Sequence, residues 1–252
     1  MTPTSQLGDG LVQVQAPNPS ERHFSALMHL LRYIQGSLTL GISYGGESPT
    51  EASTSHPAGQ SLSSSPAIGP IPRSVLPPQR VVVFADVSFA PDKSFHSFAG
   101  WIAFFNGGPI AWGAGKLQST ATSTTEAELL AASRAVKNGL YLQQLLVEFG
   151  AIPDSSSIQL YADNQAANRV INGGNTSGRL RHVAINSQFM HEHVLNNRLQ
   201  ADYVHTSENI ADSLTKSLNA DTFTRLRAKM NMFAVTTIES EDQSLDTLTY
   251  EF

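Results

Sequence analysis

The sequence contains no cysteine among its 252 residues. This absence excludes disulfides, thiolate metal sites and cysteine nucleophiles, and it fits a reducing compartment. No apolar run approaches the roughly 18 residues that a membrane span needs. The first ten residues lack the basic and apolar regions of a secretory signal. We therefore expect an intracellular protein without a membrane segment, whose chemistry depends on oxygen and nitrogen side chains.

Positive charge is also scarce, because 16 Lys and Arg stand against 21 Asp and Glu, a net charge of -5. The deficit is uneven along the chain. Residues 80–230 carry 13 basic and 12 acidic residues, whereas residues 231–252 carry five acidic residues and no basic one. The central region is therefore near neutral, so the acidic total does not exclude nucleic-acid binding, although no broad basic surface is predicted either.

Composition divides the chain into four parts. In residues 1–46, Phe24, Leu27, Leu31 and Ile34 have helical spacing, and a short strand is expected at Leu38–Tyr44. This piece is too small to bury a core and must dock on something. Residues 47–79 are rich in Ser, Pro and Gly, which predicts a flexible linker. Residues 80–230 form the expected globular domain, and residues 231–252 an acidic flexible tail.

The globular region predicts an α/β protein with a mixed sheet. Asn106-Gly107-Gly108 has the composition of a hairpin turn. An antiparallel hairpin followed by a crossover helix favours a mixed sheet with helices on its faces. Both tryptophans, Trp101 and Trp112, are expected in the core. The expected elements are strands at Val81–Ala85, Phe98–Phe105, Pro109–Trp112, Ile158–Ala162 and Leu199–His205, and helices at Ser123–Leu146, Ala166–Ile171, Val183–Asn196 and around Asp212.

Four carboxylates lie at positions where a metal site could form. Asp86 and Asp163 each end an apolar run, Glu128 lies in the first turns of a long helix, and Asp212 lies early in another helix. Mg²⁺ prefers hard oxygen ligands in a near-octahedral shell. A pair of such ions about 4 Å apart can bind both oxygens of an in-line phosphoryl displacement.

Each of these acids also has a structural explanation. Asp86 and Asp163 could form turns at strand ends, and Asp212 could favour a helix N-terminus electrostatically. Glu126 competes with Glu128 as the helix ligand, since positions two residues apart differ by about 200° around the axis. We favour Glu128, because Glu126 fits a capping box in which its side chain returns to the Ser123 amide.

Several segments resemble the ribonuclease H domain of copia-type LTR retrotransposon polyproteins. They are STTEAELLAAS at 123–133, YADNQAA at 161–167, HTSENIADSLTK at 205–216 and GGPIAW at 107–112. Glu21–Gly45 resembles the segment that connects reverse transcriptase to ribonuclease H. Two departures stand out: Val87-Ser88-Phe89 replaces the usual Ala-Asp-Trp after the first aspartate, and Arg181–Ile185 lacks an acidic residue that the family usually has.

The resemblance implies a ribonuclease H fold with a five-stranded mixed sheet and helices on both faces. It implies endonucleolytic cleavage of the RNA strand of RNA–DNA hybrids during reverse transcription, in a cytoplasmic retroelement particle and in the nucleus. By motif, the catalytic and metal-binding residues are Asp86, Glu128, Asp163 and Asp212. The implied cofactor is a pair of Mg²⁺ ions, for which Mn²⁺ can substitute, and the reverse transcriptase portion of the polyprotein is an expected partner.

Other residues are candidates for contacts with nucleic acid. Asn164 and Gln165 follow Asp163 and could contact the minor groove, where 2′-hydroxyls distinguish RNA from DNA. His205 is a candidate for an auxiliary catalytic role, and a surface histidine is the alternative. A set of basic residues is a candidate face for phosphate contacts, although a solvated surface charge is the favoured explanation for each member alone: Arg179, Arg181, His182, Arg198 and Lys216.

Two other functions stay open. The chain could be a decayed or domesticated retroelement fragment that only binds nucleic acid or protein, since protease, integrase and polymerase motifs are missing from it. It could also be a different nuclease of ribonuclease H type, such as an integrase or resolvase, although the hairpin followed by the STTEAE segment disfavours this.

Overall fold

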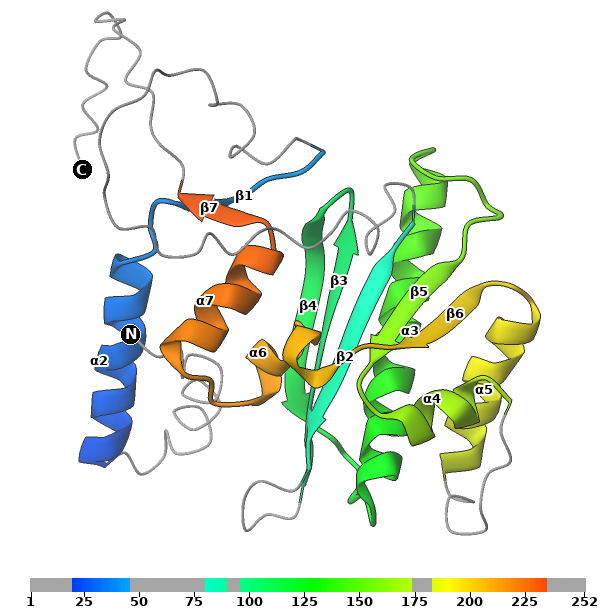
Figure 1. Cartoon of the computed structure of the whole chain (residues 1–252), viewed down its shortest axis with the longest axis horizontal. Helices are drawn as coiled ribbons and strands as arrows, with labels where there is room; N and C mark the ends of the chain where they lie inside the picture. The colour runs from blue at the N-terminus through cyan, green and yellow to red at the C-terminus, as the bar shows by residue number, and fades with distance from the viewer. Residues whose placement is uncertain (1–19, 46–79, 90–95, 174–182, 235–252) are drawn as a thin grey trace, which may run out of the picture.

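A computed structural model describes residues 20–45, 80–89, 96–173 and 183–234. Its main sheet has five strands in the order β4-β3-β2-β5-β6 (Figure 1). The strands β2, β3 and β4 are antiparallel neighbours, whereas β2, β5 and β6 run parallel. This is the mixed sheet that the sequence predicts. The bounds are Val82–Ser88 for β2, Phe98–Phe105 for β3, Gly108–Lys116 for β4, Ile158–Ala162 for β5 and Leu199–Tyr203 for β6.

The hairpin between β3 and β4 forms at the predicted turn. Asn106 and Gly107 have φ angles of 50° and 83°, and two positive φ angles are the signature of a type I′ turn. The expectation for the tryptophans is half right. Trp101 is buried in the central strand β3, but Trp112 is 56% exposed because it lies on the edge strand β4.

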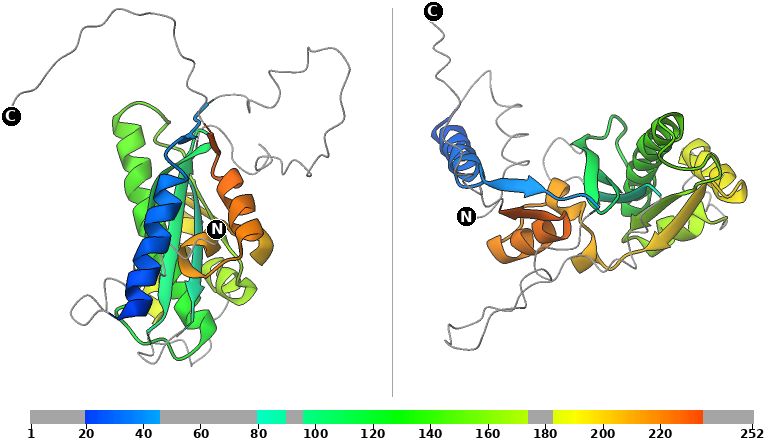
Figure 2. Two further views of the ribbon diagram at one scale, coloured as in Figure 1. Left: turned by 90° about the vertical axis from the view of Figure 1, so that its left-hand side faces the viewer. Right: turned by 90° about the horizontal axis from the view of Figure 1, so that it is seen from above.

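Helices cover both faces of the sheet, and the alternation of side chains along β2 explains why. Val81, Val83 and Ala85 pack in one cluster with α3, α4 and α5, while Val82 and Phe84 pack in a second cluster with α6. The two groups lie on opposite sides of the sheet (Figure 2). The helix bounds are Thr124–Glu148 for α3, Gln165–Ile171 for α4, Ala184–Leu195 for α5, Asp212–Thr215 for α6 and Ala220–Lys229 for α7.

A glycine allows α6 to approach the sheet closely. Gly100 in β3 is the register partner of Asp86 in β2. A Cβ atom on Gly100 would lie 2.7 Å from Thr215 Cγ2 and 2.8 Å from Leu214 Cβ. Any larger residue would therefore push α6 away from the strand that carries Asp86.

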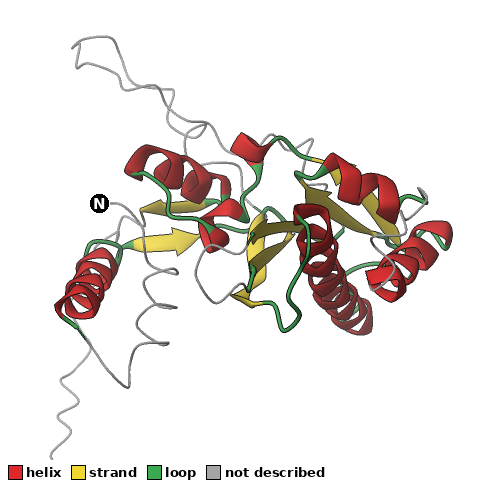
Figure 3. Cartoon of the chain, turned by 90° about the horizontal axis from the view of Figure 1, so that it is seen from below, coloured by secondary structure: helices red, strands yellow, loops and turns green. Residues whose placement is uncertain are grey.

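The N-terminal segment docks on the C-terminal one. The strand β1 (Leu40–Ile42), which follows α2 (Glu21–Gln35), pairs antiparallel with β7 (Met232–Ala234) in a separate small sheet (Figure 3). The rings of Tyr33 and Phe223 meet edge to face, 5.7 Å apart. The strand β7 falls inside the segment predicted as a flexible tail, so that expectation is wrong for residues 232–234.

Some predicted features lie outside the described residues. They are the linker at 47–79, the rest of the acidic tail, and the basic residues Arg179, Arg181 and His182. Among the helices that the structure describes, none combines the length and the apolar character needed to cross a membrane.

Candidate metal centre

Three of the four predicted carboxylates converge. Asp86, Asp163 and Asp212 each offer an oxygen atom, and these atoms all lie within 4.8 Å of one another. The sheet register explains the first two, because Ala85 in β2 pairs with Ala162 in the adjacent parallel strand β5. The residue after each alanine is an aspartate, so the two carboxylates emerge side by side. Asp212 is the first residue of α6, which packs on the face of the sheet that Val82 and Phe84 line.

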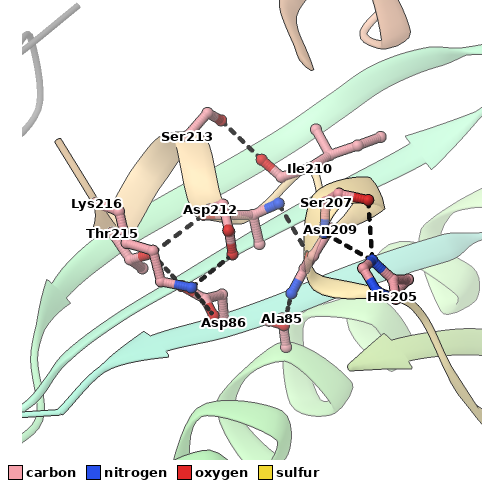
Figure 4. Close-up of polar contacts among 11 residues, drawn as sticks. Ala85, Asp86, His205, Ser207, Asn209, Ile210, Asp212, Ser213, Thr215 and Lys216 are labelled. Carbon is pink, nitrogen blue, oxygen red and sulfur yellow. Dashed lines mark hydrogen bonds and ion pairs between the residues drawn. The ribbon is translucent and has the colours of Figure 1, made fainter. Parts of the chain in front are cut away.

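Buried polar residues attach α6 to β2 and thereby position Asp212 (Figure 4). The Asn209 Nδ2 atom donates to the Ala85 carbonyl at 3.0 Å, and the Asn209 Oδ1 atom accepts from the Ala211 amide at 3.2 Å. The Thr215 hydroxyl donates to Asp86 Oδ2. The motif at 205–216 contains both Asn209 and Thr215, but no local pattern in the sequence indicates their contacts with β2.

Lys216 places a positive charge next to two carboxylates of the cluster. Its Nζ atom lies 3.1 Å from Asp86 Oδ1 and 2.9 Å from Asp212 Oδ1. Burial lowers the pKa of Lys216, but the nearby Asp86 and Asp212 carboxylates outweigh burial and raise it above its ordinary value. The sequence offered a solvated surface charge or a phosphate contact for Lys216; in the structure its ammonium group instead contacts two of the candidate metal ligands.

Glu128 lies outside the group of three but is coupled to it electrostatically. Burial, followed by the negative charges of Asp86 and Asp163, raises the pKa of Glu128 to about 9. Its Oε2 atom is buried and has no hydrogen-bond partner among the described residues. Burial and the charge of Asp86 likewise raise the pKa of Asp212 to about 7. The site therefore has more negative charge than Lys216 alone compensates.

Glu126 has a structural role at the start of α3, as predicted. The Ser123 hydroxyl accepts a hydrogen bond from the Glu126 amide at 3.2 Å, as in a capping box. The Oε2 atom of Glu126 also accepts hydrogen bonds from the amide and the hydroxyl of Thr122, at 2.6 and 2.8 Å. These contacts fix the residue before the N-cap to the first turn of α3.

The residues present suit a hard divalent cation. All four carboxylates are oxygen donors of the type that Mg²⁺ prefers. Two observations favour such a cation: the unpartnered, buried Oε2 atom of Glu128, and carboxyl groups whose pKa values are raised when no cation is near. Asp86, Asp163 and Asp212 form the group of carboxylates that could hold it.

Two other predicted site residues, Asn164 and His205, make hydrogen bonds to residues outside the carboxylate cluster. Asn164 caps α4 by accepting from the Ala167 amide at 2.9 Å, and Gln165 is exposed beside it. His205 is exposed, and its Nδ1 atom accepts from the Ser207 amide at 3.2 Å. In Figure 4 its ring lies on the far side of Asn209 from Asp86, Asp212 and Lys216. The geometry therefore gives His205 a loop-capping contact.

The five-stranded mixed sheet has the architecture that the sequence resemblance to ribonuclease H implies. The strand order and the pairing directions carry the fold assignment. Among solved structures, the chain resembles RNase H1 from Halobacterium salinarum, with 20% identity and a TM-score of 0.39 over 54% of this chain and 93% of that one. It also resembles LC11-RNase H1 in complex with an RNA/DNA hybrid, with 14% identity and a TM-score of 0.40 over 54% and 93%.

The chain is also similar to Pol polyproteins of transposons. It is 26% identical over 215 residues to the Retrovirus-related Pol polyprotein from transposon TNT 1-94 of Nicotiana tabacum, covering 85% of this chain and 14% of the relative. The RE1 polyprotein of Arabidopsis thaliana is 26% identical over 218 residues, covering 86% and 13%. The Ty1-ER2 Gag-Pol polyprotein of Saccharomyces cerevisiae is 31% identical over 157 residues, covering 62% and 9%. No family model matches the chain.

Proposed function

We propose that this chain hydrolyses the RNA strand of RNA–DNA hybrids, as the ribonuclease H part of a retrotransposon Pol polyprotein. The observation that carries the proposal is the convergence of Asp86, Asp163 and Asp212 within 4.8 Å, together with the electrostatic coupling of Glu128 to Asp86 and Asp163. Similarity to transposon Pol polyproteins supports the same function, although the chain spans only 9–14% of the three relatives described above.

In this proposal the chain's own residues bind and orient the substrate and the cofactor. The chemistry that bound Mg²⁺ supplies is a lowered pKa of the attacking water and stabilisation of the 3′-oxygen that leaves. Asp86, Glu128, Asp163 and Asp212 would hold the cofactor, for which Mn²⁺ could substitute. Asn164 and Gln165, directly after Asp163, contact the hybrid's minor groove, where the 2′-hydroxyl distinguishes the RNA strand. No covalent intermediate is involved.

In this proposal Lys216 is the counter-ion of two of the carboxylates. Its ammonium group neutralises part of the charge on Asp86 and Asp212, which otherwise repel each other at close range. A cation that binds these two carboxylates competes with Lys216 for them. The same contacts suit the alternative function, because a lysine that keeps the carboxylates neutralised without a metal would stabilise a fragment that only binds nucleic acid.

The test is cleavage of a hybrid whose RNA strand carries an end label, with Mg²⁺ or with EDTA. The decisive variant is Asp163→Asn, because Asp163 lies at a strand end and is only half-buried. The matched control is Asp154→Asn, which removes the same charge from an exposed turn. We expect Mg²⁺-dependent cleavage in the wild type and the control, and a loss of 100-fold or more in Asp163→Asn, since about 10²–10³-fold is typical when one group that stabilises the transition state is removed.

Other outcomes identify the alternatives. Hybrid binding without cleavage in the wild type would support the decayed or domesticated fragment. Cleavage of duplex DNA in preference to the hybrid would instead support a nuclease of the integrase or resolvase kind. Equal cleavage by Asp163→Asn and the wild type would remove the carboxylate cluster from the mechanism.

A further inference from the structure

The helix α2 and the turn after it present a stripe of apolar side chains to solvent. This α2 stripe consists of five large residues that recur at alternating intervals of three and four positions, each between 37% and 76% exposed: Phe24, Leu27, Leu31, Ile34 and Leu38. Such spacing places the members within α2 on one side of the helix, as in the seams at which one helix packs on another. A contiguous exposed apolar surface of this kind marks an interaction site.

Contact with α7 does not cover the α2 stripe. The ring of Tyr33 on α2 meets Phe223 on α7 edge to face, with ring centroids 5.7 Å apart. Because successive residues of an α-helix are about 100° apart, Tyr33 points about 130° away from the centre of the stripe. The docked side of α2 and its apolar side are therefore different sides of the helix.

The small sheet directs the chain that follows β7 toward the α2 stripe. In the antiparallel β1–β7 pair, Ala234 at the end of β7 lies opposite Leu40 at the start of β1. The chain that continues beyond Ala234 therefore heads toward the residues before Leu40, which are Leu38 and the end of α2. In Figure 1 the arrow of β7 points toward that end of α2.

The 18 residues at 235–252, which lie outside the described residues, contain a segment that matches the stripe. Leu245, Leu248 and Phe252 have helical spacing, and Ser244 can cap a helix that begins there. As a helix this segment spans about 10 Å from Leu245 to Phe252, the same length as the first and third members of the stripe. The ten residues at 235–244 reach up to about 33 Å, whereas α2 is about 22 Å long. The segment can therefore run back along α2.

Net charge favours the same contact. Residues 235–252 carry five acidic residues and no basic one. The helices α2 and α7, counted together with the Glu208 carboxylate that pairs with α7, carry five Lys or Arg and three Asp or Glu. Opposite net charges attract the segment to this side of the molecule.

The order of charges along the segment also suits an antiparallel arrangement. With its first apolar residue beside the third member of the stripe, Asp246 would be level with Arg32 and Glu251 level with Arg22. A parallel arrangement would instead set Asp246 near the N-terminal turn, where Glu21 lies. The antiparallel arrangement is also the one that the direction of β7 favours.

We infer that residues 245–252 pack antiparallel on the α2 stripe and cover it. This inference goes beyond the proposed function and does not depend on it, because neither the carboxylate cluster nor a nucleic acid takes part. The segment is joined to β7 by only ten residues, so its effective concentration at α2 is high. A partner that uses the stripe would have to displace this segment first.

The absence of cysteine from the chain allows the contact to be tested by disulfide cross-linking. The test variant carries Leu27→Cys and Leu248→Cys, which join the middle of the stripe to the middle of the segment. The matched control carries Ser25→Cys and Leu248→Cys, since Ser25 is an exposed residue of α2 about 150° from the centre of the stripe. Both proteins are oxidised with glutathione disulfide at low protein concentration. Mass spectrometry of peptides and non-reducing gels then measure the internal disulfide.

We expect the internal disulfide to form about tenfold or more faster in the test variant than in the control, the ratio for a docking free energy of about 1.4 kcal/mol. A disulfide needs Cβ atoms about 3.8 Å apart, so the rate reports direct contact. Adding Leu245→Asp and Phe252→Asp should reduce the rate in the test variant to that of the control. Circular dichroism melts establish that each variant is folded at the temperature of the assay.

Two results would overturn the inference. Equal rates in the test variant and the control would mean that the segment only passes near α2 at random. Disulfide-linked dimers of a chain with Leu27→Cys alone, forming faster than the internal disulfide at the same protein concentration, would assign the stripe to a second copy of this chain.

Discussion

The ammonium group of Lys216 is the one positive charge that the structure places directly against the carboxylate cluster, within the part of the chain that it describes. Replacing it with Met keeps the length of the side chain but removes the charge. We expect Lys216→Met to lower the free energy of unfolding in EDTA by about 1–3 kcal/mol, between the values for exposed and for buried pairs. The partial exposure of Lys216 is the reason for the lower end of this range.

The same substitution should have the opposite effect on cation binding. Because Lys216 and a divalent cation compete for Asp86 and Asp212, Lys216→Met should bind Mg²⁺ more tightly than the wild type. Titration calorimetry and the rise of the melting temperature with Mg²⁺ measure this directly. The control is Lys137→Met, which removes a lysine charge on the outward side of α3. If Lys216→Met and the wild type have equal Mg²⁺ affinity, Lys216 does not compete.

The raised pKa of Glu128 predicts a pH dependence of stability in the absence of metal. Its pKa is about 9 in the folded chain and 4.5 ordinarily, so between these values the folded state binds more protons than the unfolded state. The contribution of Glu128 to stability is therefore fully present below about pH 4.5 and is lost as the pH rises toward 9, by up to about 1.4 kcal/mol per unit.

Glu128→Gln should remove this dependence, since an amide does not titrate. In EDTA at pH 8 we expect the variant to melt at a higher temperature than the wild type, and near pH 4.5 we expect the difference to vanish. Added Mg²⁺ should stabilise the wild type more than the variant, because the carboxylate is then a ligand. A variant less stable than the wild type at pH 8 in EDTA would contradict the assignment of Glu128 as an uncompensated acid.

At the scale of secondary-structure elements, the close approach of α6 to β3 is what brings Asp212 to the cluster. Gly100→Ala should disturb this approach, because its Cβ would meet the Leu214 Cβ and the Thr215 methyl group below 3.0 Å. We expect a loss of about 1–3 kcal/mol of stability from overpacking, together with weaker Mg²⁺ binding. Gly115→Ala on β4 is the matched control, since its Cβ meets only Arg134 atoms, at 3.6 Å and beyond. Equal effects of the two substitutions would show that contact with α6 is not the cause.

Elements with local signals were predictable, and their contacts over long separations were not. The apolar runs before Asp86 and Asp163 and the turn at Asn106 and Gly107 follow from a few adjacent residues, and the structure confirms the strands and the turn. The hydrogen bond between Thr215 and Asp86 joins positions 129 residues apart, which no spacing rule addresses. The exposure of Trp112 depends on β4 being an edge strand, a property of the whole sheet.

The difference between local signals and long-range contacts also explains how much of the carboxylate cluster could be predicted. The sequence indicated which acids could bind a metal, because each ends a strand or begins a helix. Sequence reasoning placed Asp212 last among the four and Glu128 with the firmer three, but the distances between elements that test this order cannot be read from the sequence. The structure brings Asp212, for which a simple helix-terminus role was open, within 4.8 Å of Asp86 and Asp163, and leaves Glu128 outside that limit. It also shows that the Lys216 charge belongs to this cluster.

At the scale of the whole molecule, the small β1–β7 sheet joins the N-terminal segment to the end of the domain. The buried core clusters contain no residue from 20–45, so removing residues 1–45 should leave a cooperative unfolding transition. Removing residues 232–252 should do the same, because both deletions break the same strand pair. Each should lower the free energy of unfolding, the first by more, since it also removes the contact between Tyr33 and Phe223.

The double deletion distinguishes a joint structural unit from two independent segments. Because β1 and β7 stabilise each other, the second deletion has little left to remove, and the combined loss should be smaller than the sum of the single losses. Denaturant unfolding of the four chains gives the coupling free energy. Additive losses would mean that the pair contributes nothing in solution. A positive coupling would show that the segment resembling a reverse transcriptase connection is a folded part of this domain, held to it by the β1–β7 pair.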